Sequence, residues 1–348
     1  MKKIVITAWL FAFTTAIGAQ TMVFPVDSNG VKPNCVAYYL PKTSVDVVVE
    51  VEHVREKPGP FVNYSSRFLG ISDVIVEEAD RWEIATVTIE QHAVPDETKH
   101  YQVLVSNKST ASNLSINEDG VILGVNYTTT TNTEEKTGRR KKQEMPSVEP
   151  DLSVLGEDAL VAGSIPKMAE MAAKQIYRIR ENRTDLLSGE SEHTPDGQAL
   201  QRMLEEMDKR EEALVALFVG KRVVEKHVET FSIVPDADVE NLVVCRYSSI
   251  EGMLGPDNLM GQPIYLTLKT QQNVAQQAQK TTKQCGLYYN LPAKVKAEVS
   301  DGESVLAKTI VEMAQFGTVN YLPASLFNNT TTTIKFSTMG AVLSIEQK

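Results

Sequence analysis

The sequence is poor in the residues that mark stapled, fibrous or disordered chains. Its 348 residues include only 3 cysteines, 19 glycines and 15 prolines. So few cysteines exclude a small disulfide-stapled scaffold, and so little glycine and proline excludes a collagen. Hydrophobic residues make up 42% of the chain and charged residues 23%, which excludes a disordered acidic tail. The remaining class is a globular protein of about two domains, each able to bury its own core.

Local catalytic signatures are also missing. The chain contains none of the motifs His-Glu-x-x-His, Gly-x-Ser-x-Gly, Gly-x-Gly-x-x-Gly or the phosphate-binding loop. We therefore expect no cofactor, no bound metal and no catalytic residue. A glycosidase can recruit its carboxylates from distant positions, so a hydrolase with a dispersed site stays open as an alternative.

Two groupings of metal-ligating side chains have simpler explanations. His92, Asp96 and His100 could converge in a hairpin and bind a metal, but turn chemistry at Pro95-Asp96 explains the pattern without one. Four residues of one loop could bind a cation, although a solvated loop tip is the simpler interpretation. They are Glu190, Glu192, His193 and Asp196.

The three cysteines leave the thiol chemistry open. Cys35, Cys245 and Cys285 can form at most one internal bridge, and an oxidising compartment would permit it. Their spacing fits no zinc pattern, and nothing local activates Cys35 or Cys285 toward a distant histidine. Burial as small hydrophobic side chains is the simplest interpretation.

Only the N-terminus carries a long hydrophobic run. Lys2 and Lys3 precede an apolar stretch over residues 4–17, and the small residues Gly18 and Ala19 follow it. This order predicts a secretory signal peptide over residues 1–19, cleaved after Ala19. The alternative, a transmembrane anchor, needs about 20 apolar residues, more than this run supplies. We expect an exported protein, periplasmic or associated with the outer membrane, whose mature chain does not span the bilayer.

The charge balance is acidic. The chain has 35 basic and 45 acidic residues, and removal of Lys2 and Lys3 takes the basic count to 33 and the net charge from −10 to −12. This charge repels phosphate backbones, so we expect no nucleic-acid partner. The one basic run, residues 139–142, lies in a stretch without apolar periodicity, which favours a solvated linker over a polyanion-binding patch. Such a run is also a site for a trypsin-like protease.

The hydrophobic pattern changes period twice along the chain. Residues alternate between apolar and polar from 45 to 53, which predicts a half-buried strand, and further strands are expected at 82–90, 101–105 and 121–126. After Pro58-Gly59-Pro60, apolar spacing predicts a short helix lying across this sheet. About eight short strands are expected after Gly220. The predicted fold is α+β and mainly β, with two antiparallel β-sandwich-like modules and a long antiparallel helical hairpin.

The hairpin is predicted from two apolar stripes at helical spacing. The first begins at Ile165, with Ser164 as N-cap, and the second includes Leu204 and Leu217. We expect both stripes to be core, and Glu211 is the one acidic residue within the second stripe. The predicted domains are a signal peptide (1–19), an N-terminal β module with one short helix (33–127), a linker (128–151), the hairpin (152–219) and a C-terminal β-sandwich module (220–348).

Two segments of the N-terminal β region recur in the C-terminal one. Residues 35–42 resemble residues 285–294, with paired tyrosines before a proline, and residues 120–125 resemble residues 340–345. This internal sequence similarity predicts a duplicated β module. Adjacent tyrosines on a strand serve opposite faces, so one of each pair should pack inward and the other should reach an interface. The candidate interaction residues are Tyr38, Tyr39, Tyr288 and Tyr289.

Several of these motifs resemble one known family. They are Tyr38-Tyr39-Leu40-Pro41-Lys42-Thr43, Pro58-Gly59-Pro60-Phe61, Tyr64, Phe68-Leu69-Gly70, Ala216-Leu217-Phe218-Val219-Gly220-Lys221, Gly286-Leu287-Tyr288-Tyr289 and Gln315-Phe316-Gly317. Together with the signal peptide, their order is similar to that of an exported family of Gram-negative anaerobes, domain of unknown function family 4831. The resemblance covers nearly the whole mature chain. It implies an envelope location and supplies no activity and no catalytic residues.

The function expected from the sequence is non-enzymatic. Export, β modules and a helical hairpin favour an envelope protein that acts through protein-protein or surface contacts with another envelope protein or a cell-surface component. The first alternative is a binding module for a glycan or small molecule, which would need a concave, aromatic-lined pocket. The oligomeric state is not fixed by the sequence.

Overall fold

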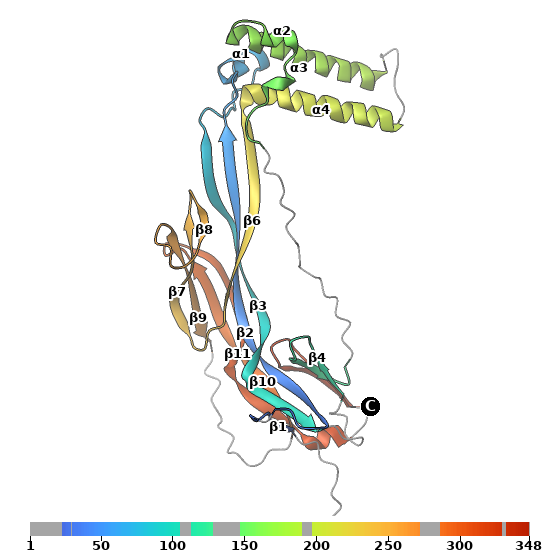
Figure 1. The fold of residues 1–348 in the computed structure, drawn as a ribbon, viewed down its shortest axis with the longest axis vertical. Helices are drawn as coiled ribbons and strands as arrows, with labels where there is room; N and C mark the ends of the chain where they lie inside the picture. The colour runs from blue at the N-terminus through green and yellow to red at the C-terminus, as the bar shows by residue number, and fades with distance from the viewer. Residues whose placement is uncertain are drawn as a thin grey trace, which may run out of the picture.

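The computed structural model describes residues 23–28, 30–104, 113–127, 147–189, 197–271, 286–328 and 332–347. The predicted signal peptide and the basic run at residues 139–142 lie outside these ranges. The molecule is elongated, with helices at one end, a small sheet at the other, and a long ribbon of strands between them (Figure 1). The mainly β, antiparallel character expected from the sequence is confirmed.

Thirteen strands are described, and they form three antiparallel sheets. The first sheet has the order β1 (Val23–Pro25), β3 (Ala79–Leu104), β2 (Cys35–Lys57), β6 (Lys221–Ile233). The second has the order β11 (Val305–Pro323), β10 (Gly286–Ser300), β9 (Gln262–Thr270), β7 (Val239–Ser248), β8 (Gly252–Leu254). The third, at the end opposite the helices, has the order β13 (Val342–Gln347), β12 (Thr332–Phe336), β5 (Ile122–Val125), β4 (Leu114–Ile116).

Strands β2 and β3 form the long axis of the molecule. The alternation predicted over residues 45–53 continues in both directions, and β2 ends at Lys57, before Pro58. The two strands predicted at 82–90 and 101–105 are one strand, β3, with a register irregularity where Tyr39 and Pro41 face His100 and Pro95. The prediction of a break there was wrong, because β2 supplies partners on both sides of Pro95 and carries the ladder past it.

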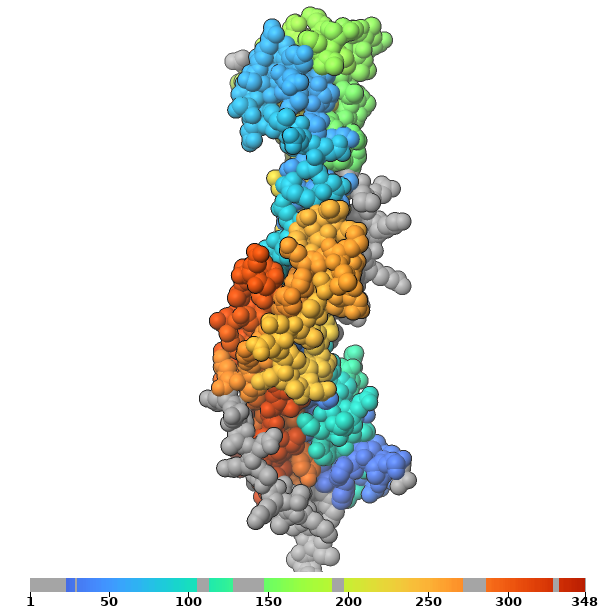
Figure 2. Space-filling view, turned by 90° about the vertical axis from the view of Figure 1, so that its left-hand side faces the viewer, coloured from blue at the N-terminus to red at the C-terminus, as the bar shows by residue number. Residues whose placement is uncertain are grey.

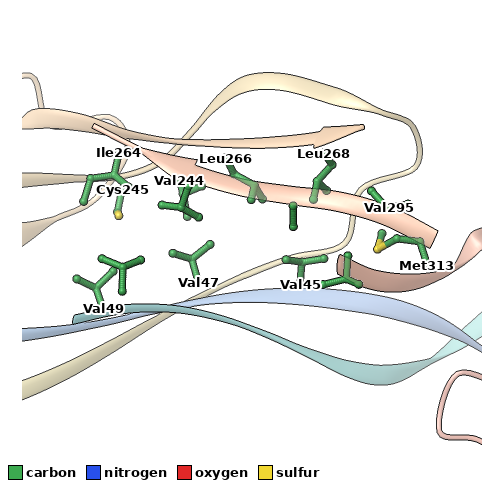
Figure 3. Packing of buried hydrophobic residues seen from close by; sticks show 14 of the residues in the cluster. Val45, Val47, Val49, Val244, Cys245, Ile264, Leu266, Leu268, Val295 and Met313 are labelled. Atoms are coloured by element: carbon green, nitrogen blue, oxygen red, sulfur yellow. The ribbon is translucent and has the colours of Figure 1, made fainter. Parts of the chain in front are cut away.

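The main core lies between the first and second sheets (Figure 3). Val45, Val47 and Val49 of β2 point toward Leu266 and Leu268 of β9. All five side chains are fully buried. The alternation in β2 therefore exists because one face of the strand must leave water while the other stays hydrated.

The two β regions of the chain share sheets. Strand β6 pairs with β2 over thirteen residue pairs, and β12 pairs with β5. The expectation of two β modules with separate sheets therefore differs from the structure. The physical reason is that the backbone N–H and C=O groups of β2 need hydrogen-bond partners along both edges of the strand. Strand β3 pairs with one edge, and β6, which follows the helices in the sequence, pairs with the other.

The sequence repeat corresponds to a repeat in strand pairing. Tyr38 faces Tyr101 in the β2–β3 pair, and Tyr288 faces Tyr321 in the β10–β11 pair. Each pair has a register irregularity a few residues further along, at Tyr39/Pro41 and at Leu291/Ala293.

The second repeated segment forms matching hairpins in the small sheet. In each hairpin a glycine with positive φ closes the turn, Gly120 at +78° and Gly340 at +81°. A side-chain oxygen accepts the following amide in both turns, from Val121 to Asn117 and from Ala341 to Ser337. Positive φ suits glycine because it has no Cβ. The two hairpins therefore adopt the same turn, with a glycine at positive φ and the same side-chain hydrogen bond.

The helical end has its own core. It contains η1 (Val62–Tyr64), α1 (Ser65–Leu69), η3 (Leu152–Val154), α2 (Glu157–Leu160), α3 (Ile165–Ser188) and α4 (Gly197–Val219). Phe61 packs with Ile176, Leu214 and Phe218 in a cluster separate from the sheet core. The short helix expected to lie across the sheet instead packs against α3 and α4, because the apolar groups nearest to it belong to those helices.

Candidate interaction site on the helical arm

Helices α3 and α4 lie side by side, run in opposite directions and project from the end of the β ribbon (Figure 1). We call this pair the helical arm. Ser164 occupies the N-cap position of α3 with extended backbone, and Pro166 follows within the first turn. Helix α3 ends where Gly189 adopts a left-handed conformation with φ of +78°. The local sequence therefore defines where α3 starts and stops.

Ion pairs connect the two helices near the middle of the arm. Arg180 Nε donates to Glu211 Oε1 at 2.7 Å, and Arg183 Nη2 lies 2.6 Å from Glu211 Oε2 and also contacts Asp208. The Glu211 side chain is only 14% exposed. Its burial tends to raise the pKa, but hydrogen bonds from Arg180 and Arg183 outweigh burial and hold the pKa below its ordinary value. The lone acid within the second apolar stripe is therefore a charged cross-link between helices.

Burial along the arm is uneven. Near the ribbon, Ala172, Ile176, Leu214 and Leu217 are buried. Beyond the ion pairs, none of the α4 residues from Gly197 to Arg210 is buried. Two helices can cover only the line along which they touch, so the outer part of the α4 stripe stays partly hydrated, although Leu186 near the end of α3 is buried. The expectation that both stripes are core therefore does not hold for the outer half of the second stripe.

A hollow of about 450 Å³ lies between the helices on this outer half. Its apolar lining comes from Ile179, Met203 and Met207, and its charged lining from Arg178, Glu206 and Arg210. We call these six residues the arm groove. A second hollow of about 430 Å³ shares Glu206 and Arg210 and extends the depression toward Val154 and Leu155.

The charges of the arm groove are predominantly basic. Glu206 pairs with Lys209 at 2.9 Å, so its charge is already partly balanced. Arg178 and Arg210 make no ion pair with any residue that the structure describes. Two arginines beside the exposed Met203 and the partly buried Met207 form a surface suited to binding, because arginine offers several donors and methionine adapts to the shape of a partner.

The four tyrosines predicted as interaction residues lie elsewhere, near the small sheet. Tyr38 is fully buried, and burial raises the pKa of its hydroxyl well above the ordinary value. Its hydroxyl accepts from the backbone N–H of Tyr288 at 3.1 Å, and its ring stacks on Tyr101. Tyr38 is therefore a core residue and the inward-facing member of its pair, with its aromatic surface covered.

The other three tyrosines are partly buried. The ring of Tyr39 stacks on His100 at 4.0 Å between centroids, and Tyr288 stacks on Tyr101 at 4.5 Å. Tyr289 lies 6.4 Å from Phe336. Tyr101 stacks on both Tyr38 and Tyr288, so these two candidates belong to one aromatic cluster. Tyr39 and Tyr289 instead contact His100 and Phe336.

The candidate metal ligands do not converge. His92, Asp96 and His100 lie along one strand, β3, and each has its own partner: Asp46 for His92, Thr98 for Asp96 and Tyr39 for His100. Residues 92–100 belong to one continuous strand, so the hairpin that would bring these ligands together is not formed. Across the described residues, no group of three His, Cys, Asp or Glu side chains is placed to hold a metal ion. The loop candidates Glu190, Glu192, His193 and Asp196 lie outside the described residues.

The thiols offer no activated nucleophile within the described chain. Cys35 is a partly buried free thiol and Cys245 a fully buried one. Burial raises the pKa of Cys245 to about 12, so its thiolate is not available near neutral pH. Cys285 lies outside the described residues. Cys245 contributes to the sheet core, as expected of a small hydrophobic side chain.

One polar cluster could not be predicted from the sequence. Above the sheet core, Trp82 stacks on His53 at 4.4 Å and lies 5.0 Å from His227. Arg55 and Glu225 form an ion pair on the same ribbon. The signal was present in β2, where the valines on one face give way to His53 and then Arg55. The partners could not be foreseen, because they come from β3 and β6.

Comparisons with known proteins identify a family and no activity. A family model described as "Domain of unknown function (DUF4831)" matches residues 34–343. No curated protein and no solved structure matches the chain. Among the described residues, no helix combines the length and hydropathy needed to cross a bilayer.

Proposed function

This chain belongs to the DUF4831 family, and because that membership supplies no activity, we propose from the structure that it is a non-enzymatic envelope protein whose helical arm binds another protein. The β body positions the arm. Strand β2 has 23 residues and runs from the small sheet to the helical end (Figure 1). At roughly 3.3 Å per residue, it spans about 75 Å.

The observation that carries the proposal is the arm groove. Met203 is 42% exposed, and Ile179 and Met207 are only partly buried, although all three belong to the apolar stripes of their helices. Exposed apolar side chains lined by arginine are typical of protein interfaces, where methionine and arginine are enriched. The space-filling view shows the narrow ribbon that separates the helical end from the wider β body (Figure 2). A partner on the arm would therefore contact a projecting element.

The location is part of the proposal. The N-terminal order of two lysines, an apolar run and small residues supports export to the periplasm or to an outer-membrane surface. The acidic balance of the chain argues against nucleic acid as the partner.

A photo-crosslinking residue at position 203 tests the proposal in cells. Replacement of Met203 should give covalent adducts of higher mass after irradiation, because the side chain lies in the groove. The matched control replaces Glu303, which is exposed in the turn between β10 and β11, far from the arm. Adducts from position 203 and not from position 303 are expected. No adduct from position 203, or equal adducts from both positions, would contradict an arm-specific contact.

The two alternatives have less support. A glycan or small-molecule site needs an aromatic-lined concavity, but the hollows described on the helical end contain no Tyr, Trp or Phe in their lining. A hydrolase needs an activated nucleophile or two close carboxylates in a cleft, and the buried Cys245 thiol is not activated.

A further inference from the structure

We propose that the arm groove binds an amphipathic helix of a partner protein and that acidic residues flank the apolar face of that helix. This inference rests on the proposed function, since it specifies the chemistry of the segment that the arm would contact. It depends on two independent properties of the groove: its apolar shape along α4 and its unpaired arginines.

The shape of the site fits a helix. The groove and its extension follow α4 from Met203 to Ala213. Ten residues of helix cover about 15 Å, close to three turns. An amphipathic helix laid along this line would present side chains at positions i, i+3, i+4 and i+7 to Ile179, Met203 and Met207. It would complete the apolar contact that two helices alone leave partly hydrated.

The charges of the site select the flanking residues of the partner. Several charged side chains near the groove are already paired: Arg180 and Arg183 with Glu211, Lys174 with Glu170, and Lys209 with Glu206. Arg178 and Arg210 line the groove and have no ion-pair partner among the described residues. A carboxylate on each side of an incoming apolar stripe would satisfy them with charge-assisted hydrogen bonds.

The same charges disfavour a second copy of this chain as the occupant. In a two-fold interface the same patch occurs on both sides, so each arginine pair would be brought close to its own symmetry copy. Repulsion between them would oppose the contact, and Glu206 is already engaged by Lys209. A helix from another protein carries no such restriction.

The test uses two designed 18-residue peptides and the purified chain. Both peptides carry leucines at helical spacing; one has glutamates beside the leucine stripe and the other has lysines at the same positions. Fluorescence anisotropy at low salt should show at least about tenfold tighter binding of the glutamate peptide, and the preference should weaken as salt rises. Equal binding of the two peptides, or tighter binding of the lysine peptide, would overturn the inference.

Matched charge reversals on α4 locate the effect. Arg210→Glu should remove the preference for the glutamate peptide, while Arg202→Glu should retain it within about twofold. Both residues are exposed on the same helix, and Arg202 does not line the groove. Circular dichroism should show that both variants keep their helices. A preference that survives Arg210→Glu, or that is lost equally in both variants, would overturn the site.

The crosslinking experiment separates this inference from the proposed function. Adducts from position 203 without a glutamate preference would leave the arm as a contact element and reject the acidic helix. Absence of adducts would reject the contact itself. Adducts in which the crosslinked peptide belongs to a second copy of this chain would reject the partner helix in favour of self-association.

Discussion

Glu211 illustrates how one residue takes its role from its neighbours. Its place in an apolar stripe marks it in the sequence as the exception, but the arginines that neutralise it lie about thirty residues earlier, on α3. In the structure it joins the two helices at the boundary between the buried and the hydrated half of the arm. The exception in the pattern is therefore the group that fixes the helix pairing.

The stability of the arm should fall in acid because of Glu211. A carboxyl with a lowered folded-state pKa stabilises the fold above its ordinary pKa of about 4.3 and loses that contribution as the pH falls through the folded value. Urea unfolding followed by far-UV circular dichroism should show this loss below about pH 4. Glu211→Gln should cost about 1–2 kcal/mol at pH 7, because Arg180 and Arg183 keep some contact with water. The variant should also lose part of the acid dependence, and an unchanged acid profile would contradict the assignment.

Gly59 is required where the strand ribbon meets the arm. A Cβ at this position would lie 2.2 Å from the carbonyl oxygen of Leu217, which accepts the backbone N–H of Phe61 at 2.8 Å. Gly59→Ala should therefore destabilise the chain by more than about 2 kcal/mol, measured by thermal unfolding. Gly255→Ala is the control, because a Cβ there meets nothing within 4 Å. Equal melting temperatures for the two variants would refute the close approach.

At the scale of elements, the arm consists of a packed base and a hydrated outer half. Apart from Glu211, the apolar stripe continues along the whole of α4, so the pattern predicts burial for all of its apolar residues. Burial separates them, because α1, η1 and α2 cover only the half of the arm near the ribbon. Among the described residues, no further element covers the apolar stripe of the outer half, and that difference supports a binding role.

Two leucines of α4 test this division. Leu214 is fully buried, so Leu214→Ala should cost about 2–5 kcal/mol. Leu204 is only partly buried, so Leu204→Ala should cost about 1 kcal/mol or less. Urea denaturation of both variants, with the same m-value as the parent, gives the comparison. Equal losses would mean that the outer half of the arm is packed as tightly as its base.

At the scale of the whole molecule, the repeated β segments are not independent. The strand pairs β2–β3 and β10–β11 lie on opposite sides of the main core. The third sheet combines β4 and β5 with β12 and β13. Strand β6 follows the helical end in the sequence and pairs with β2. The N-terminal and C-terminal β regions therefore depend on each other for paired strand edges and for buried surface.

Limited proteolysis should reveal this dependence. Trypsin should cut the basic run at residues 139–142, which the sequence predicts to be a linker. The two fragments should remain together on size-exclusion chromatography, because β6 stays paired with β2 and β12 with β5. They should separate only in denaturant. Fragments that elute apart in native buffer would show that the two β regions fold independently.

The sequence by itself determined the mainly β class of fold, most of the places where helices and strands occur, the repeat of the tyrosine segments and the family. These properties are local, since alternation, helical spacing and turn residues act over a few positions. Only the tertiary structure decided that Tyr38 is core, that β2 pairs with β6, that Trp82 contacts both His53 and His227, and that the arm groove is left open by the described residues. Each of these features depends on which distant segment packs against a given face. A periodic pattern predicts that a face is buried, but it does not identify the segment that covers it.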